Sequence, residues 1–255
     1  MSFAGRRVVV LATALAAALV ACGTDWEQNL PLTSSATAAP VHTGVSNGKA
    51  YTVDRSSSTG TTTDGAGRWD LAIDTLTGGD PRVSAAFNDA VHHAAQRLLD
   101  ETTAARPDKG RWTFETSPQI RFATTSVSAL ISGEFSVEGA DHSVGSVTNV
   151  VIDSRSGRQI TLKELFVNDQ EGLNRLSEQT KLLLPPAMGV TATPMPNHPG
   201  NKPLLENFDN WIPTPAGLEI HFADHQFTAG TPVITVPWSA LNDLLAPGMD
   251  ALRRP

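Results

Sequence analysis

The chain has a single cysteine, Cys22, among its 255 residues. A protein exported to an oxidising compartment with only one cysteine has no internal disulfide bond to form. This absence excludes a disulfide framework. The folded part must therefore be stabilised by a buried apolar core.

Basic residues are also scarce. The 19 Lys and Arg residues are outnumbered by 26 Asp and Glu residues, so the formal net charge is −7 at pH 7. No cluster of Lys and Arg occurs beyond the first residues and the extreme C-terminus. A surface that binds nucleic-acid phosphates normally carries a basic patch. We therefore expect no nucleic-acid partner.

Long apolar runs are absent apart from Val8 to Ala21. That run is shorter than the about 20 residues that a membrane-spanning helix needs. Arg6 and Arg7 precede it, and a charged start before a short apolar run is typical of a secretory signal. The stretch from Leu19 to Cys22 resembles a bacterial lipobox, whose cysteine is acylated and becomes the new N-terminus. We predict a lipoprotein signal peptide over 1–21 and lipidation at Cys22; the alternative is an ordinary secreted protein.

The predicted anchor leaves 255 − 21 = 234 residues outside the membrane. Two or more acyl chains hold a protein firmly, at about 0.8 kcal/mol per buried CH₂. Residues 22–48 are rich in Ser, Thr, Ala and Pro, which predicts a flexible tether. The stretch 55–67 is again rich in Ser, Thr and Gly. We expect an extracytoplasmic protein, anchored to the cell membrane by Cys22, with a single folded domain over 49–255.

Apolar periodicity predicts a mixture of strands and helices. Trp69, Leu71 and Ile73 alternate with polar residues, as on a half-buried strand. From Pro81 onward apolar residues recur at helical spacing, which predicts a long helix that ends before Pro107. Further strands are predicted over 112–122, 127–137, 144–153, 218–222 and 233–236, and helices over 162–166, 171–184 and 237–245. The predicted class is α+β: a mixed or antiparallel sheet packed against a long helix, with a short C-terminal helix.

A polar cluster from Ser154 to Arg158 interrupts two alternating apolar stretches. The guanidinium groups of Arg155 and Arg158 are suited to binding an anion. Gly157 supplies the positive φ that a tight hairpin needs. Charged side chains at a hairpin tip are usually solvated, so the cluster is interpreted as a turn rather than a ligand site.

Two stretches resemble the C-terminal half of the RsiV-type extracytoplasmic domain, which also occurs in secreted mycobacterial immunogenic proteins. They run from Asn149 to Phe166 and from Asn207 to Leu241. The resembling signature consists of Asp153, a Ser-Gly turn, Ile160-Thr161-Leu162, Leu165-Phe166, Gly217-Leu218, Ile220, Phe222, Gly230 and Val236-Pro237. It covers roughly Val144 to Leu245.

The resemblance implies a compact α+β domain displayed outside the membrane. Members include the sensor part of an anti-sigma factor and proteins reported as esterases, so function diverges on one scaffold. Here no hydrophobic span follows a cytoplasmic segment, so the anti-sigma role is not carried over. The stretch Gln226 to Gly230 is also shorter than its counterpart in many members, which puts partner contacts there in doubt.

Candidate catalytic residues are few. Gly44 to Gly48 matches G-x-S-x-G, but Ser46 is followed by a predicted strand rather than the helix of a nucleophile elbow. Glu134 and Glu138 share a strand face about 13 Å apart, too far for glycoside hydrolysis. Asp141 and His142 have no identifiable serine partner. We expect no catalytic residue.

Histidine and tryptophan side chains are the candidate binding residues. His92 and His93 are neighbours on a predicted helix and point about 100° apart, so they cannot chelate one ion. His221 and His225 lie about 13 Å apart on a continuous strand. We expect no metal and no cofactor. Trp211, His221 and His225 are the candidate partner-binding surface, although a tryptophan in this position is more often a core or loop-anchoring residue.

The leading hypothesis is a cell-envelope lipoprotein whose domain binds a protein or an envelope glycan without catalysis. The alternative is a weak envelope esterase. The two differ in one structural feature: an esterase needs a serine hydroxyl within hydrogen-bond reach of a histidine that a carboxylate holds.

Overall fold

The computed structural model describes residues 42–105, 110–189 and 198–254. The described part is α+β, as predicted, with a mixed six-stranded sheet and a second, three-stranded sheet. The predicted signal peptide over 1–21 and the predicted lipidation site Cys22 lie outside these ranges. So does the predicted tether over 22–48, except for its last residues.

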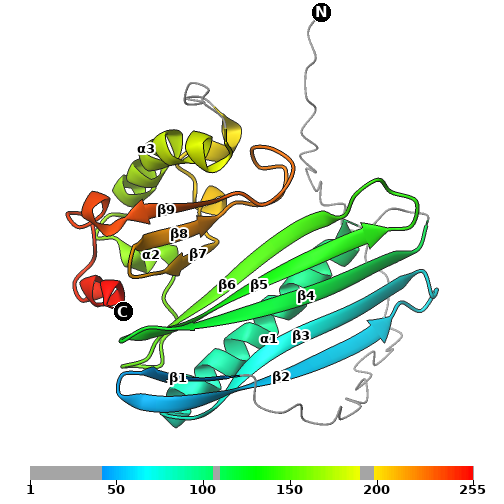
Figure 1. Cartoon of the computed structure of the whole chain (residues 1–255), viewed down its shortest axis with the longest axis horizontal. Helices are drawn as coiled ribbons and strands as arrows, with labels where there is room; N and C mark the ends of the chain where they lie inside the picture. Colours follow the sequence, from blue (N-terminus) through cyan, green and yellow to red (C-terminus); the bar gives the residue numbers. More distant parts are fainter. Residues whose placement is uncertain (1–41, 106–109, 190–197, 255) are drawn as a thin grey trace, which may run out of the picture. The chain divides into compact units, whose positions relative to one another are not determined.

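The larger sheet has the strand order β1-β2-β3-β4-β5-β6 (Figure 1). Neighbouring strands are antiparallel except β3 and β4, which are parallel because helix α1 (Pro81–Ala104) connects them. The strands are β1 (His42–Ser46), β2 (Lys49–Thr61), β3 (Gly67–Gly78), β4 (Trp112–Phe122), β5 (Ser126–Val137) and β6 (Val144–Asp153).

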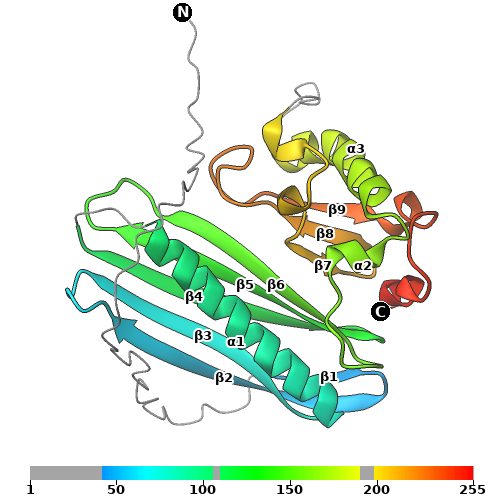
Figure 2. The same ribbon diagram turned by 180° about the vertical axis from the view of Figure 1, so that it is seen from behind.

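Helix α1 begins at a well-capped end. The Asp80 side chain accepts a hydrogen bond from the N–H of Arg82, and Pro81 occupies the first turn, where it sacrifices no helical hydrogen bond. The buried face of the helix carries Val83, Phe87, Val91, Ala94 and Leu98. These side chains share one apolar core with residues of the large sheet. Figure 2 shows α1 lying across one face of that sheet.

Regular structure begins earlier than predicted. Strand β1 lies inside the predicted tether over 22–48 and pairs with β2. Asn47 and Gly48 connect the two strands with φ values of 49° and 68°, the positive values that an Asn-Gly hairpin turn requires. Strand β2 also continues through the Ser-rich stretch after Arg55, because it pairs with β3 as far as Thr61.

The smaller sheet belongs to the C-terminal lobe, which we define as the described residues from 159 to 254. It has the order β7-β8-β9 (Figure 1). Its elements are α2 (Leu162–Leu165), α3 (Asp169–Ala187), β7 (Trp211–Pro213), β8 (Gly217–His221) and β9 (Val233–Pro237), with 3-10 turns at Pro199–Asn201 and Leu205–Asn207. Thr161 and Glu164 form a capping box on α2, and Asn168 caps α3. The lobe has its own apolar core.

The predicted closing helix over 237–245 is wrong in type. The chain forms short 3-10 turns at Trp238–Ala240 and Met249–Arg253. Between them, Val167 donates its N–H to the carbonyl of Leu244, and Ala246 donates to that of Leu165. This pairing makes Leu245 a bridge partner of Phe166, and residues 241–244 form turns instead of a continuous helix.

The large sheet has two different faces. Val150 and Ile152 belong to the core with α1, whereas Val151 between them belongs to the core of the C-terminal lobe. Alternate residues of a strand point to opposite faces. We call the α1 side the inner face and the other side the outer face. The C-terminal lobe packs on the outer face mainly at one end, the covered end, which is marked by Arg121, Asn149 and Val151. It also contacts the edge strand β6 nearer the other end, where Asp224 accepts the N–H of Gly145.

Candidate functional site

The predicted partner-binding tryptophan is a core residue. Only 1% of Trp211 is exposed, and it packs in the core of the C-terminal lobe. Its carbonyl accepts a hydrogen bond from Nδ2 of Asn149 on β6. The prediction that Trp211 lies on a binding surface is therefore wrong; hydrophobic burial of the large ring accounts for its position.

His221 is part of a polar clasp between the lobe and the sheet. Its Nε2 lies 2.8 Å from Oε1 of Glu219, and Arg121 of β4 binds both carboxylate oxygens of Glu219, at 3.1 and 2.9 Å. The hydrogen bond from His221, helped by Arg121, lowers the pKa of Glu219 to about 2, although burial opposes the shift. The side chain of His221 is only 11% exposed. We call these three residues the clasp.

His225 is more accessible than Trp211 and His221. Its φ of 62° puts it in the left-handed region, and its Nδ1 pairs with Oδ1 of Asp224 at 2.9 Å. Asp224 also accepts the backbone N–H groups of Gly145 and Gly230. Burial raises the pKa of Asp224, but these two N–H donors outweigh it and hold that pKa below its usual range. The His225 ring lies 6.1 Å from that of His142. The three predicted residues thus do not form one surface.

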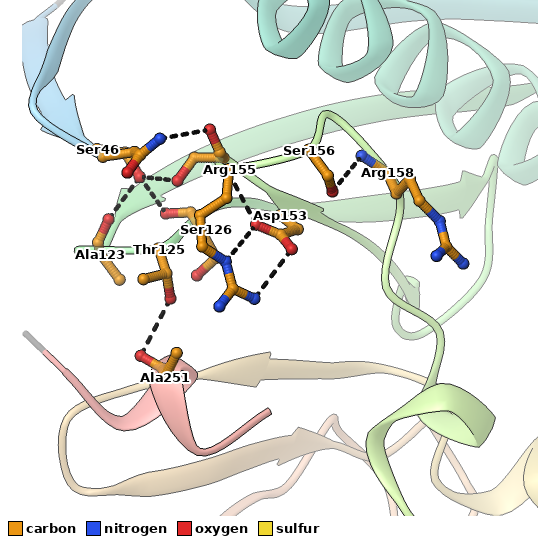
Figure 3. Close-up of polar contacts among 11 residues, drawn as sticks. Ser46, Ala123, Thr125, Ser126, Asp153, Arg155, Ser156, Arg158 and Ala251 are labelled. Atoms are coloured by element: carbon orange, nitrogen blue, oxygen red, sulfur yellow. Dashed lines mark hydrogen bonds and ion pairs between the residues drawn. The ribbon is translucent and has the colours of Figure 1, made fainter. Parts of the chain in front are cut away.

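Ser46 is a buried residue with a structural role. It is 1% exposed, and its Oγ hydrogen-bonds to the carbonyl of Ala123 at 2.6 Å (Figure 3). The same Oγ hydrogen-bonds to Oγ of Ser154 at 2.7 Å. The hydroxyl thereby ties the β1-β2 hairpin to the β4-β5 turn and to the end of β6. Among the described residues, no serine hydroxyl hydrogen-bonds to a histidine side chain.

The cluster from Ser154 to Arg158 is the predicted turn. Asp153 donates its N–H to the carbonyl of Arg158, and Gly157 has a φ of 74°. Both arginines have partners within the turn region: Arg155 pairs with Asp153 at 2.9 Å and Arg158 with Glu164 at 3.0 Å (Figure 3 shows the first). The cluster therefore offers no free anion site.

A groove of about 390 Å³ opens over β2, β3 and β4, away from the clasp. Its side chains include Thr59, Arg68, Asp70, Thr113 and Glu115, all of them exposed. They alternate with Trp69 and Phe114, which pack into the inner core, so they belong to the outer face. The volume lies in the range of small-ligand sites, although this groove has a larger share of polar side chains than such sites, which are mostly apolar.

Three carboxylates lie side by side across the outer face. Asp70 of β3 is the register partner of Glu115 of β4, and Glu115 is the partner of Glu134 of β5. All three are exposed, and none forms an ion pair with any described residue. Like charges directly opposite each other on neighbouring strands destabilise a sheet. We call this set the acid row and the surrounding surface the open end of the outer face.

Sequence reasoning missed the acid row. The three carboxylates are separated by 45 and 19 positions in the chain, and only strand register brings them together. The alternation of each strand gives the face of each residue but not its neighbour across the sheet. The sequence pattern relates Glu134 only to Glu138, on its own strand.

No described helix is long and apolar enough to cross a membrane. Within the same ranges, no group of three or more His, Cys, Asp or Glu side chains is arranged to hold a metal ion.

Comparisons with known proteins identify the fold. No family model and no curated protein matches the chain. A solved DUF3298 family protein from Pseudomonas aeruginosa is similar to it, with a TM-score of 0.55 and 16% identity over 80% of this chain and 96% of that one. A DUF3298 family member from Bacteroides fragilis is also similar, with a TM-score of 0.53 and 11% identity over 81% of this chain and 98% of that one. At these identities the likeness establishes a shared fold.

Proposed function

We propose that this protein is a cell-envelope lipoprotein, anchored through Cys22, whose domain binds a basic protein partner through the open end of its outer face. The lipobox-like stretch from Leu19 to Cys22 supports the anchor. The RsiV-type resemblance from Asn149 to Phe166 supports an extracytoplasmic domain. The fold shared with the two DUF3298 structures is compatible with that resemblance.

The acid row is the observation that carries the binding proposal. A polar sheet face exposed to water is ordinary, but three carboxylates in adjacent register positions repel one another. A partner with Lys or Arg side chains would relieve that repulsion on binding. Complementary charge also accelerates association and selects against acidic partners. The charge favours a basic protein surface over a neutral glycan.

The rest of the open end suits the same role. Thr59, Thr61 and Thr113 supply hydroxyl donors and acceptors beside the acid row. Arg68 is the one basic side chain that lines the groove. The inner face beneath is stiffened by Trp69, whose indole lies where a side chain at Gly60 would be. A rigid platform loses little entropy when a partner binds.

The anchor is tested by membrane fractionation of cells that make the full chain. The wild-type protein should sediment with membranes, and Cys22→Ser should move to the soluble fraction. Membrane association of Cys22→Ser equal to wild type would contradict lipid anchoring.

The binding surface is tested by site-specific photo-crosslinking in the native envelope. A crosslinking amino acid at Thr113, inside the groove, should give a discrete higher-mass adduct. The matched position is Gln96, exposed on α1 at the opposite side of the sheet. The adduct should be absent from Gln96 and should disappear when Glu115 is replaced by Lys. No adduct from Thr113, or the same adduct from both positions, would contradict the proposal.

A further inference from the structure

Strand β2 leaves most of one edge of the large sheet unpaired. Strand β1 pairs with β2 only from Lys49 to Val53, whereas β3 pairs with it as far as Thr61 (Figure 1). On the side away from β3, no described strand accompanies β2 from Asp54 to Thr61. We call this stretch the free edge. A strand edge of this length offers backbone N–H and C=O groups to another strand.

The direction of the backbone groups along β2 follows from its hairpin with β3. Thr62, just beyond β2, donates its N–H to the carbonyl of Gly67. In an antiparallel pair, successive residues direct their backbone groups to alternate sides of the strand. The N–H and C=O groups of Ser57, Thr59 and Thr61 therefore point away from β3, toward the free edge.

The side chains of the free edge do little to prevent strand pairing. Natural edge strands are shielded by charged side chains, proline or bulges. From Ser56 to Thr61 the side chains are those of Ser, Thr and Gly alone, and the register with β3 continues without a bulge. The guanidinium of Arg55 is turned toward Asp74, which it binds at 2.7 Å. The free edge is therefore suited to accept a further strand.

The acid row points toward this edge. Thr59 is the register partner of Asp70, the first carboxylate of the row, and both residues line the groove. A strand paired with β2 would place one residue opposite Thr59, two strand spacings or about 10 Å from the backbone of Asp70. The flexible stem of a lysine at that position can pass over the small Thr59 side chain to the Asp70 carboxylate. Arg68 is the register partner of Thr61, so an acidic side chain fits opposite Thr61.

We propose that the partner contributes an extended segment that adds a strand to the free edge of β2, with a basic side chain opposite Thr59 and an acidic one opposite Thr61. Backbone hydrogen bonds supply affinity in this mode of binding, and alternate side chains supply specificity. We expect the added strand to be antiparallel, because antiparallel pairing is slightly the more stable. The inference rests on the proposed function, since it assigns the form in which the basic partner meets the acid row.

A capped peptide of the sequence Glu-Thr-Lys-Thr-Lys-Thr-Thr tests the added strand. In antiparallel pairing it sets its Glu opposite Thr61 and its first Lys opposite Thr59. Hydrogen exchange of the full chain in detergent micelles, followed by NMR, reports on single amides. At saturating peptide, exchange at Ser57 and Thr59 should slow at least about tenfold, because their N–H groups gain hydrogen bonds. Exchange at Gln96, on exposed α1, should not change.

Two variants at one position separate the backbone from the side chain. Ser57→Pro removes an N–H that faces the free edge, so the affinity for the peptide should fall at least about tenfold. Ser57→Ala keeps that N–H and should bind like wild type. Both variants should fold, because Ser57 is exposed and its N–H is not part of the pairing with β3. Asp70→Asn tests the acid row in the same assay and should also weaken binding.

Wild-type affinity of Ser57→Pro, or binding without slower exchange at Ser57 and Thr59, would overturn the added strand. Weaker binding by Asp70→Asn in that case would leave the proposed acid-row surface standing. A peptide that does not bind wild type would also overturn the inference, and crosslinking from Thr113 then decides the proposed function separately. A free chain that sediments as a dimer, and as a monomer when it carries Ser57→Pro, would assign the edge to a second copy instead.

Discussion

The two ends of the outer face use charge in opposite ways. At the covered end, Glu219 is half-buried and is bound by Arg121 and His221. At the open end, Asp70, Glu115 and Glu134 are exposed in adjacent register positions, without an ion pair to any described residue. Strand β4 carries both Arg121 and Glu115, so the same structural element serves both ends.

The two ends thus differ in the role of their carboxylates. Glu219 stabilises the fold, whereas we propose that the acid row binds a partner. When burial partly desolvates a carboxylate, groups within the protein must compensate for the lost hydration. Arg121 and His221 do so for Glu219. A carboxylate kept in water needs no such compensation, and its repulsion from neighbours is tolerated at a small cost. The paired end is therefore interpreted as structural and the unpaired end as the binding surface.

The largest expected effect concerns Trp211 beneath the covered end. Trp211→Ala should lower the free energy of unfolding by about 3–5 kcal/mol, because it removes a fully buried aromatic side chain. Trp69→Ala, at the half-buried tryptophan of the open end, should cost less. Urea unfolding of both variants measures the difference. Equal costs would show that the two ends are not packed differently.

Acid should break the clasp. The pKa of Glu219 is lowered from 4.5 to about 2, so the stability it contributes is present above pH 4.5 and is lost as the pH falls towards 2. The contribution amounts to up to about 3 kcal/mol. The free energy of unfolding of Glu219→Gln should therefore fall less than that of wild type between pH 4.5 and 2. Urea unfolding measures this difference.

A matched exposed variant, Glu138→Gln, controls for the removal of one carboxylate and should keep the steep acid loss. An unchanged pH dependence in Glu219→Gln would show that the clasp does not stabilise the folded state.

Ser46 should contribute stability rather than catalysis. Ser46→Ala removes the hydroxyl that joins Ala123 and Ser154, and should lower the free energy of unfolding by about 1–2 kcal/mol. Any hydrolysis of short-chain aryl esters by the protein should be unaffected. Loss of ester hydrolysis without loss of stability would instead favour a nucleophilic role for Ser46.

The smallest expected effect has the opposite sign. Glu115→Gln removes two like-charge contacts in the acid row and should raise the free energy of unfolding by about 0.5 kcal/mol at low salt. The gain should shrink at high salt, which screens exposed charges. Thermal unfolding at two salt concentrations measures it. A destabilised Glu115→Gln would mean that the carboxylate has a structural role in the sheet.

Much of the fold was predictable because local patterns were strong. The strands predicted over 112–122, 127–137 and 144–153 agree with β4, β5 and β6 to within one residue, since their β-branched residues alternate clearly. The first part of strand β2, Lys49 to Val53, is predicted from the sequence, but its Ser-rich half is not, because that half has no apolar alternation and is held by its pairing with β3. The predicted closing helix does not form, because backbone hydrogen bonds to Leu165 and Val167 outweigh the local helix propensity there.

The candidate sites were much less predictable. His221 and Trp211 were singled out by residue type, but their burial and partners depend on how the lobe packs on the sheet. The acid row depends on strand register, and the free edge of β2 depends on where its pairing with β1 ends. None of these relations leaves a periodic signal in the sequence.

The most direct test of the central claim is the affinity of the full chain for a decalysine peptide at several salt concentrations. Wild type is compared with Asp70→Asn/Glu115→Gln/Glu134→Gln and with a matched triple on exposed α1, Asp89→Asn/Asp100→Asn/Glu101→Gln. Both variants lose three negative charges. We predict salt-sensitive binding that the acid-row variant loses and the α1 variant retains. Equal loss in both variants would show that overall charge, and not the open end, attracts the peptide.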